Sequence, residues 1–326
     1  RRPSGLGVNA AEDLASDALP SPGGSLHMRS PAALRLRPAH RQTSLPSALE
    51  RTAGSSSARG GGPAPLEETA QADLQPVPHP EQALRAAINA LVAASLAKPK
   101  ELDWEAQYTG LQDARRLVFH HLQCVTPQLH TLVLAILPAV DSLRSNLAKN
   151  AMLLLRELVA AMGKAMDAEL DYIVPMLIKK SADNGWLALE ADKTLGELSE
   201  TLTDARVLSS LLGSATHKSA VARMRVARHV EGLIARAGTR AFAGAPGRDL
   251  LERTFSVCVG FLDEGGVETR TLGKRTLYAL WELLGPSGDF ERMLRRLPSE
   301  VKVKQVKAVV DDPNGMPPMP RRLAPP

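Results

Sequence analysis

From Pro80 onward, apolar residues recur at positions i, i+3, i+4 and i+7, and short polar turns interrupt the pattern. This spacing is typical of amphipathic α-helices, and we find no convincing run of the alternating pattern that marks β-strands. The pattern predicts an all-α chain with helices near residues 81–97, 104–122, 127–141, 145–162, 168–181, 186–202, 204–212, 219–237, 248–262, 267–284, 289–296 and 300–310.

Three of these helices repeat one another without gaps. The segments are AKNAMLLLRELVAAMG (148–163), RMRVARHVEGLIARAG (223–238) and RTLGKRTLYALWELLG (270–285). Aligned, they share apolar columns and a final glycine: Leu155, Val230 and Leu277; Leu158, Leu233 and Leu280; Val159, Ile234 and Trp281; Met162, Ala237 and Leu284; Gly163, Gly238 and Gly285. Glycine adopts the left-handed conformation of a helix C-terminus without strain.

The turns that precede the second helix of each pair fall near Trp104, Arg144, Asn184, Lys218 and Val267, at spacings of 40, 40, 34 and 49 residues. These spacings scatter around the period of HEAT and armadillo repeats, about 40 to 47 residues. The fold expected is therefore an α-solenoid of five helical hairpins and a terminal sixth, each touching only its neighbours. An irregular helical bundle is the alternative.

Composition limits the folded part of the chain. All eleven aromatic residues lie between Trp104 and Phe290, whereas residues 1–79 hold ten of the 24 prolines and eight of the 24 glycines. Such a segment has too little apolar surface to offset the entropy of ordering its backbone. We therefore expect a disordered arm (1–79), a folded domain (80–312) and a disordered tail (313–326). Because the chain begins with Arg1 rather than Met, we expect it to be a piece of a longer protein.

No motif for catalysis, a cofactor or a metal is found. The chain contains no Gly-rich phosphate loop, no G-x-S-x-G and no H-E-x-x-H. Cys124 and Cys258 lack metal-ligand spacing and are expected to be buried, reduced thiols; His120, His121 and His130 are expected on helix surfaces or in the core. No apolar run reaches the roughly 18 residues that a membrane span needs. The sequence thus predicts a non-enzymatic protein without a membrane segment.

The turns between paired helices carry an unusual set of residues. In a stack of hairpins these turns emerge along one edge, and here they hold Trp104, Arg144, Asn184, Trp186, His217, Lys218, Arg270, Lys274 and Arg275. Aromatic and arginine anchors dominate protein interfaces, and the net charge of +5 favours an acidic partner. We expect Trp104 to be an exposed contact and Trp186 to be buried by its hairpin. Nucleic-acid binding would rest on charge alone, without a recognised module.

Six stretches in order resemble a known family. They are DWEAQYTGLQDARRLV, LRSNLAKNA, GKAMDAELDYIVPMLIKKSADN, AVARMRVARHV, ETRTLGKRTL and DFERMLRRLPS. Through them, residues 81 to about 310 resemble a TOG domain, the tubulin-binding HEAT array, of the CLASP type. They are most similar to the TOG-array regulators of axonemal microtubules, also called crescerins.

The resemblance implies that the turn edge binds the α/β-tubulin heterodimer or the microtubule lattice, with the first-turn aromatic on β-tubulin and the last basic turns on α-tubulin. It also implies a place on the cytoplasmic cytoskeleton, in the axoneme of a cilium or flagellum, and other axonemal proteins as partners. The implied tubulin-binding residues are Trp104, Arg144, Asn184, Lys218, Arg223, Arg270, Lys274 and Arg275. The chain departs from the family at Ala188, where a basic residue is usual.

Two other interactions are considered. In the arm, TSLP (Thr43 to Pro46) is a loose version of the Ser-x-Ile-Pro motif that docks on end-binding proteins, and it lies in a basic stretch that could attract an acidic microtubule surface. The alternative function for the folded domain is a HEAT or armadillo adaptor that binds a peptide or a partner on its concave face, without tubulin.

Overall fold

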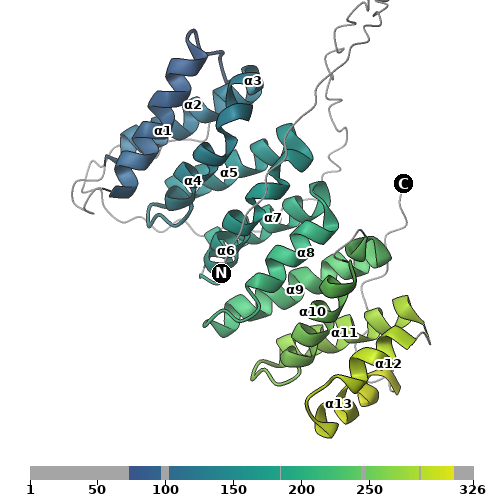
Figure 1. Ribbon diagram of the computed structural model, residues 1–326. Helices are drawn as coiled ribbons and strands as arrows, with labels where there is room; N and C mark the ends of the chain where they lie inside the picture. Colours follow the sequence, from purple (N-terminus) through teal and green to yellow (C-terminus); the bar gives the residue numbers. More distant parts are fainter. Residues whose placement is uncertain (1–72, 97–102, 184, 244–246, 286–287, 312–326) are drawn as a thin grey trace, which may run out of the picture. The chain divides into compact units, whose positions relative to one another are not determined.

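The computed structural model of the chain describes residues 73–96, 103–183, 185–243, 247–285 and 288–311, all within one compact unit (Figure 1). These ranges are helical and contain no strand. Twelve α-helices form six hairpins: α1 (Pro80–Leu96) and α2 (Trp104–His120); α4 (Leu129–Val140) and α5 (Ser145–Met162); α6 (Leu170–Ser181) and α7 (Trp186–Thr201); α8 (Asp204–Gly213) and α9 (Ala220–Ala237); α10 (Gly247–Phe261) and α11 (Val267–Leu284); α12 (Gly288–Arg295) and α13 (Glu300–Asp311).

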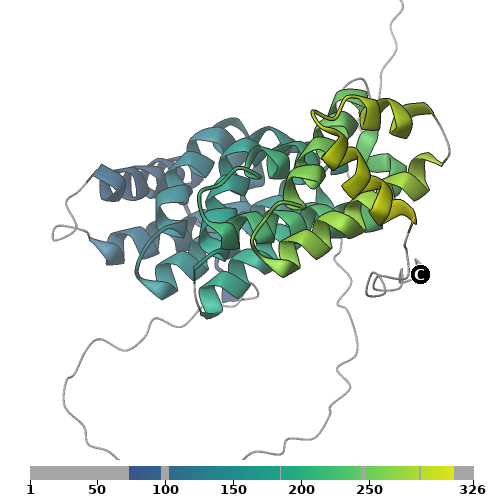
Figure 2. The ribbon, with the colours of Figure 1, turned by 90° about the horizontal axis from the view of Figure 1, so that it is seen from below.

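The hairpins stack into two layers of helices. The second helices of successive hairpins pack against one another (α2 on α5, α5 on α7, α7 on α9, α9 on α11, α11 on α13), as do most of the first helices. Figures 1 and 2 show the paired helices lying side by side along this stack. The prediction of an all-α solenoid of about six HEAT-like hairpins is confirmed.

The apolar columns read from the sequence form the core between the layers. Leu155, Val230 and Leu277 are fully buried, as are Leu158 and Leu280, and Leu233 is buried too. The third column is buried at its first two positions, but Trp281 in the last repeat is only half-buried. The stripe therefore marks the inner face of α5, α9 and α11.

The three repeat glycines end these helices as expected. Gly163, Gly238 and Gly285 have φ values of 52°, 56° and 62°, a region where a side chain is strained. Each amide donates to a carbonyl four residues earlier, at Val159, Ile234 and Trp281. The same signal thus stops the second helix of three hairpins.

Two short elements precede the second hairpin, and the sequence pattern does not separate them from the helices on either side. A short helix, α3 (Leu122–Val125), and a 3₁₀ turn (Thr126–Gln128) with a proline precede α4. By length and composition, the segment Leu122–Val140 is helical and apolar enough to cross a membrane, so the expectation that no such segment exists is wrong. Its apolar side chains Leu132, Val133 and Ile136 are buried in the core, which explains its composition.

The folded part begins before the predicted boundary at residue 80. Residues 74–77, which belong to no helix, lie along α2, and we name them the strap. The Leu74 side chain is buried, and Arg116 and His120 of α2 bond to the strap's carbonyls: Arg116 Nε to Gln75 at 2.7 Å, Arg116 to Pro76 at 3.2 Å and His120 Nε2 to Leu74 at 2.7 Å. The rest of the predicted arm (1–72) and the predicted tail (313–326) lie outside the described residues.

Candidate functional site

From the second hairpin to the sixth, the turns between the two paired helices lie on the same side of the stack, at the lower left in Figure 1, and the start of α2 joins them there through the contact of Trp104 with Arg144. We name these turns, together with the helical turns that flank them and the facing ends of α1 and α2, the turn edge. Side-chain contacts join neighbouring turns: Arg144 to Trp104, Lys179 to Asp141, Arg223 to Glu264 and Lys302 to Asp263. Residues far apart in the sequence are thereby brought into one strip.

Trp104 opens α2 at the first turn. The carboxylate of Asp103 accepts a hydrogen bond of 2.9 Å from the amide of Ala106 and so caps the helix directly before the indole. The guanidinium of Arg144 lies 4.9 Å from the centre of a Trp104 ring, within cation–π range. Trp104 is half-buried, so it is less exposed than the contact that we expected, but it is not a core residue. It is a partly exposed aromatic paired with the neighbouring turn.

The expectation that Trp186 is buried is wrong, since its relative exposure is 47%. Trp186 is the first residue of α7 and follows Gly185, whose φ is 89°. A helical side chain leans toward the N-terminus, so at the first position it reaches beyond the helix end instead of into the core. The third turn therefore also presents an aromatic. Asn184, the predicted contact of this turn, lies outside the described residues, and Ala188 is buried.

Arg223 and Arg270, both predicted as contacts, hold their own turns. Each is the fourth residue of its helix, α9 or α11, and each points back to the turn before it. Arg223 Nη1 donates to the carbonyls of His217 and Lys218 at 2.7 and 3.1 Å; Arg270 Nη1 donates to those of Glu264 and Gly265 at 2.7 and 2.8 Å. The hydrogen bonds of Arg223 to Glu264 raise the pKa of this guanidinium above its usual value.

The other predicted basic residues differ in exposure. Arg144, Lys218 and Lys274 are exposed to solvent. Arg275 is half-buried, beside Glu231 of α9. Burial raises the pKa of Glu231 above its ordinary value, and the charge of Arg275 opposes this increase. Arg275 thus faces the interior of the stack more than the turn edge.

The sequence analysis missed a row of exposed apolar side chains. Of the eleven large apolar residues that are exposed in the described part of the chain, seven lie at the turn edge: Leu96, Leu143, Trp186, Leu189, Val221, Val267 and Val301. Each of the six hairpins contributes at least one of them. A recognisable signal existed, because Leu143 in DSLRSN and Val267 in EGGVETR are apolar residues inside otherwise polar turns.

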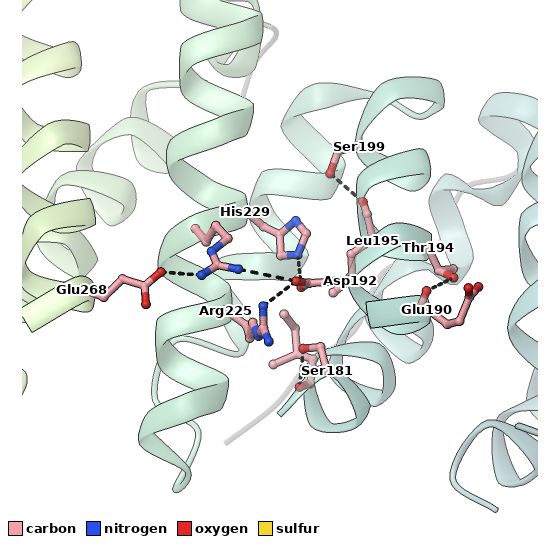
Figure 3. A network of polar contacts seen from close by, with 11 residues as sticks. Ser181, Glu190, Asp192, Thr194, Leu195, Ser199, Arg225, His229 and Glu268 are labelled. Atoms are coloured by element: carbon pink, nitrogen blue, oxygen red, sulfur yellow. Dashed lines mark hydrogen bonds and ion pairs between the residues drawn. The ribbon is translucent and has the colours of Figure 1, made fainter. Parts of the chain in front are cut away.

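Ion pairs join the second helices of successive hairpins. Arg115 of α2 pairs with Glu157 of α5 at 2.8 Å, and Arg156 of α5 pairs with Glu190 of α7 at 2.9 Å. Figure 3 shows the next step, where Asp192 of α7 accepts from Arg225 at 2.5 Å and His229 at 2.9 Å, both on α9. Arg228 continues the series to Glu268 of α11.

Asp192 is the centre of this series. Burial raises the pKa of Asp192, but the hydrogen bond from His229 and the charges of His229, Arg225 and Arg228 together hold it below its ordinary value of 3.8. Asp192 is therefore ionised at neutral pH and joins the third hairpin to the fourth.

The described residues contain no cluster of three or more His, Cys, Asp or Glu residues suited to a metal ion. Nδ1 of the exposed His130 lies 2.9 Å from Glu169 Oε2, and His120 bonds to the strap. Cys258 is buried as expected, and burial raises the pKa of its thiol to about 12, whereas Cys124 is only half-buried. Both thiols are free.

This fold and its sequence define the class of the protein. Residues 84–261, more than half of the chain, match the CLASP N-terminal family. The chain belongs to this family.

Two relatives are the "TOG array regulator of axonemal microtubules protein 1" of Mus musculus, 27% identical over 231 residues, and the protein of the same name of Homo sapiens, 31% identical over 141 residues. The matches cover 70% and 43% of this chain but only 12% and 8% of those relatives. The chain therefore corresponds to a small part of each relative.

Solved structures share the fold. The "CEP104 TOG domain" has a TM-score of 0.50 at 17% identity and covers 73% of this chain and 98% of its own. A chain from "Structural Basis of Microtubule Plus End Tracking by XMAP215, CLIP-170 and EB1" also has a TM-score of 0.50 at 17% identity, covering 73% of this chain and 94% of its own. The solenoid described above is thus a TOG fold.

Proposed function

We propose that this chain is a binding module for α/β-tubulin or the microtubule lattice, and that its turn edge is the binding surface. The observation that carries the proposal is the concentration of exposed apolar side chains on this edge, since monomeric proteins rarely expose contiguous apolar surface without a partner. Exposed basic residues accompany them: Arg144 beside Trp104, Lys218 in the fourth turn and Lys274 on α11. This mixture suits a partner that is acidic and partly apolar.

The family supports this choice of partner. The names of the relatives describe regulators of axonemal microtubules, and the solved structures with this fold include a TOG domain and a plus-end tracking protein. We therefore propose that the chain acts on microtubules of the ciliary or flagellar axoneme, where other axonemal proteins would be further partners. Its action is binding, without catalysis, and any effect on polymerisation follows from unequal affinity for different forms of tubulin.

The test separates the turn edge from other exposed apolar surface. Leu143→Ser combined with Leu189→Ser should weaken binding at least tenfold, because both side chains are exposed and would lose desolvated contact area. The matched control is Leu134→Ser on α4 combined with Tyr172→Ser on α6. Both side chains are exposed, and both lie away from the turn edge. Binding is measured to free tubulin dimers and to pelleted microtubules.

Each outcome has a meaning. Loss in the edge variant with unchanged melting supports the proposal, and the preferred form of tubulin shows whether the module recruits subunits or holds the lattice. Equal loss in the control would place the contact on the first-helix face. No binding by the unaltered chain would leave the adaptor function.

A further inference from the structure

The fourth and fifth turns share a hydrogen-bond arrangement that cannot be predicted from their sequences. In each, an arginine at the fourth helical position uses Nη1 to reach the carbonyls six and five residues earlier, at 2.7 to 3.1 Å. Turn carbonyls lack helical partners, so a charged donor that satisfies two of them holds the turn in one conformation. Arg223 therefore holds residues 217–218, and Arg270 holds residues 264–265.

Glu264 connects these two arrangements. Its backbone carbonyl accepts from Arg270, and its carboxylate accepts from Arg223 Nε at 2.6 Å and Nη2 at 2.8 Å. The contact is a bidentate pair with a planar fork of donors on one side and two oxygens on the other, a geometry that lysine cannot reproduce. The side chains are only 23% and 17% exposed, so the pair is shielded from solvent.

These hydrogen bonds leave the guanidinium of Arg223 little capacity to bind a group of another protein. Four hydrogen bonds engage its three guanidinium nitrogens, and its charge is already opposed by a carboxylate. A partner carboxylate would have to displace Glu264 and leave that group unpaired. The neighbouring side chains of Lys218, Val221 and Val267, by contrast, are exposed.

We propose that Arg223, Glu264 and Arg270 form a clamp that fixes the fourth and fifth turns relative to each other and so positions Lys218, Val221 and Val267 for binding. Arg223 and Arg270 are then positioning residues and not direct contacts. The consequence for tubulin binding rests on the proposed function, whereas the clamp itself is a property of the free protein.

The clamp is tested first without tubulin, by hydrogen exchange of the free chain. Glu264→Gln should speed exchange about tenfold at the amides of residues 214–219, although the change lies in the other turn, because residues in direct contact are energetically coupled. The control is Asp171→Asn, which breaks the Arg206–Asp171 pair. This pair joins the N-terminal ends of α6 and α8, away from the turn edge. Unchanged exchange at 214–219 in Glu264→Gln would overturn the clamp.

Binding then distinguishes positioning from contact. If the clamp positions the turns, Glu264→Gln and Arg223→Lys each weaken tubulin binding about tenfold, and combining them adds little, since either change breaks the same pair. If Arg223 touches an acidic partner, Glu264→Gln should preserve or strengthen binding by freeing the guanidinium, and Arg223→Lys should retain most affinity because the charge remains. That second pattern would overturn the positioning role.

Salt dependence gives a readout that a purely structural change does not move. Lys218→Gln removes an exposed charge and should reduce the dependence of affinity on salt. Glu264→Gln should lower affinity but should not reduce its salt dependence. A reduced salt dependence in Arg270→Gln equal to that of Lys218→Gln would make Arg270 a direct contact. Failure of the unaltered chain to bind tubulin would refute the proposed function, and the exchange experiment would still decide the clamp.

Discussion

The helical glycines of this chain differ in whether neighbouring atoms leave room for a side chain, and the sequence does not reveal this difference. A Cβ added to Gly273 of α11 would lie 2.9 Å from Phe261 Cβ and 3.1 Å from the carbonyl oxygen of Cys258. Both neighbours are parts of α10, so this glycine allows α10 and α11 to approach closely. At Gly196 of α7, no atom other than those of the adjoining α7 backbone and of the two flanking residues lies within 4 Å of the added Cβ.

Alanine at these two positions should therefore have opposite effects. Gly273→Ala should lower the free energy of unfolding by about 1 to 3 kcal/mol, because α10 must shift. Gly196→Ala should raise it by roughly 0.5 to 1 kcal/mol, because it only removes glycine's entropic cost in a helix. Urea unfolding followed by circular dichroism measures both. A Gly273→Ala protein as stable as the unaltered chain would refute the close approach.

At the scale of elements, the strap is the part of the fold that extends beyond the sequence prediction. The segment LQPVPH (74–79) is irregular and proline-rich in sequence, and only the contacts of Leu74 and Gln75 with α2 show that it is folded. Its carbonyls are satisfied by side chains of α2, and Val77 packs against the core. The strap packs against α2 at the end of the described stack, and there it adds contacts to a hairpin that is joined on its other side to the second hairpin.

The strap should contribute measurably to stability. Leu74→Ala should lower the free energy of unfolding by about 2 kcal/mol, since the leucine is buried at an end of the stack where partial collapse can relieve the cavity. Leu143→Ala is the matched control, because that leucine is fully exposed and should change nothing. Thermal unfolding of the full chain compares them. Equal melting temperatures would mean that the strap does not stabilise the domain.

At the scale of the whole molecule, the stack is a chain of interfaces between hairpins, and Asp192 supports the one between the third and fourth. Such proteins behave approximately as a sum of repeat stabilities and nearest-neighbour contacts. Weakening one interface therefore weakens the connection between the two halves of the domain. The pKa of Asp192 lies below its ordinary value, so the folded state favours the ionised form.

The sign of the pH effect follows from this direction. A depressed carboxyl pKa adds stability that is fully present above the ordinary value of 3.8 and is lost as pH falls through the lower, folded-state pKa. Asp192→Asn should thus cost about 2 kcal/mol at pH 7, given a partly buried pair, and the difference from the unaltered chain should shrink below pH 4. Urea unfolding across pH 3 to 7 measures it, with Asp311→Asn at the exposed end of α13 as control. A difference that stays constant with pH would exclude this role.

Prediction from sequence succeeded where the signal is local and repeated. Helix ranges, the apolar columns and the three positive-φ glycines follow from spacing that each helix carries within itself. The candidate site was predicted less well. The turns were located correctly, but the exposure of Trp186, the internal bonds of Arg223 and Arg270 and the row of exposed apolar residues were not foreseen.

The sequence by itself determined the all-α solenoid, its six hairpins and the CLASP-type family, because periodicity, glycine stops and ordered motifs are properties of the linear chain. Only the tertiary structure decided which charges are available. Glu264 and Arg223 are 41 residues apart, and their pairing exists only because two hairpins stack. The sequence shows that a side chain is basic, whereas whether it meets solvent, a turn carbonyl or a carboxylate depends on neighbours brought near by folding.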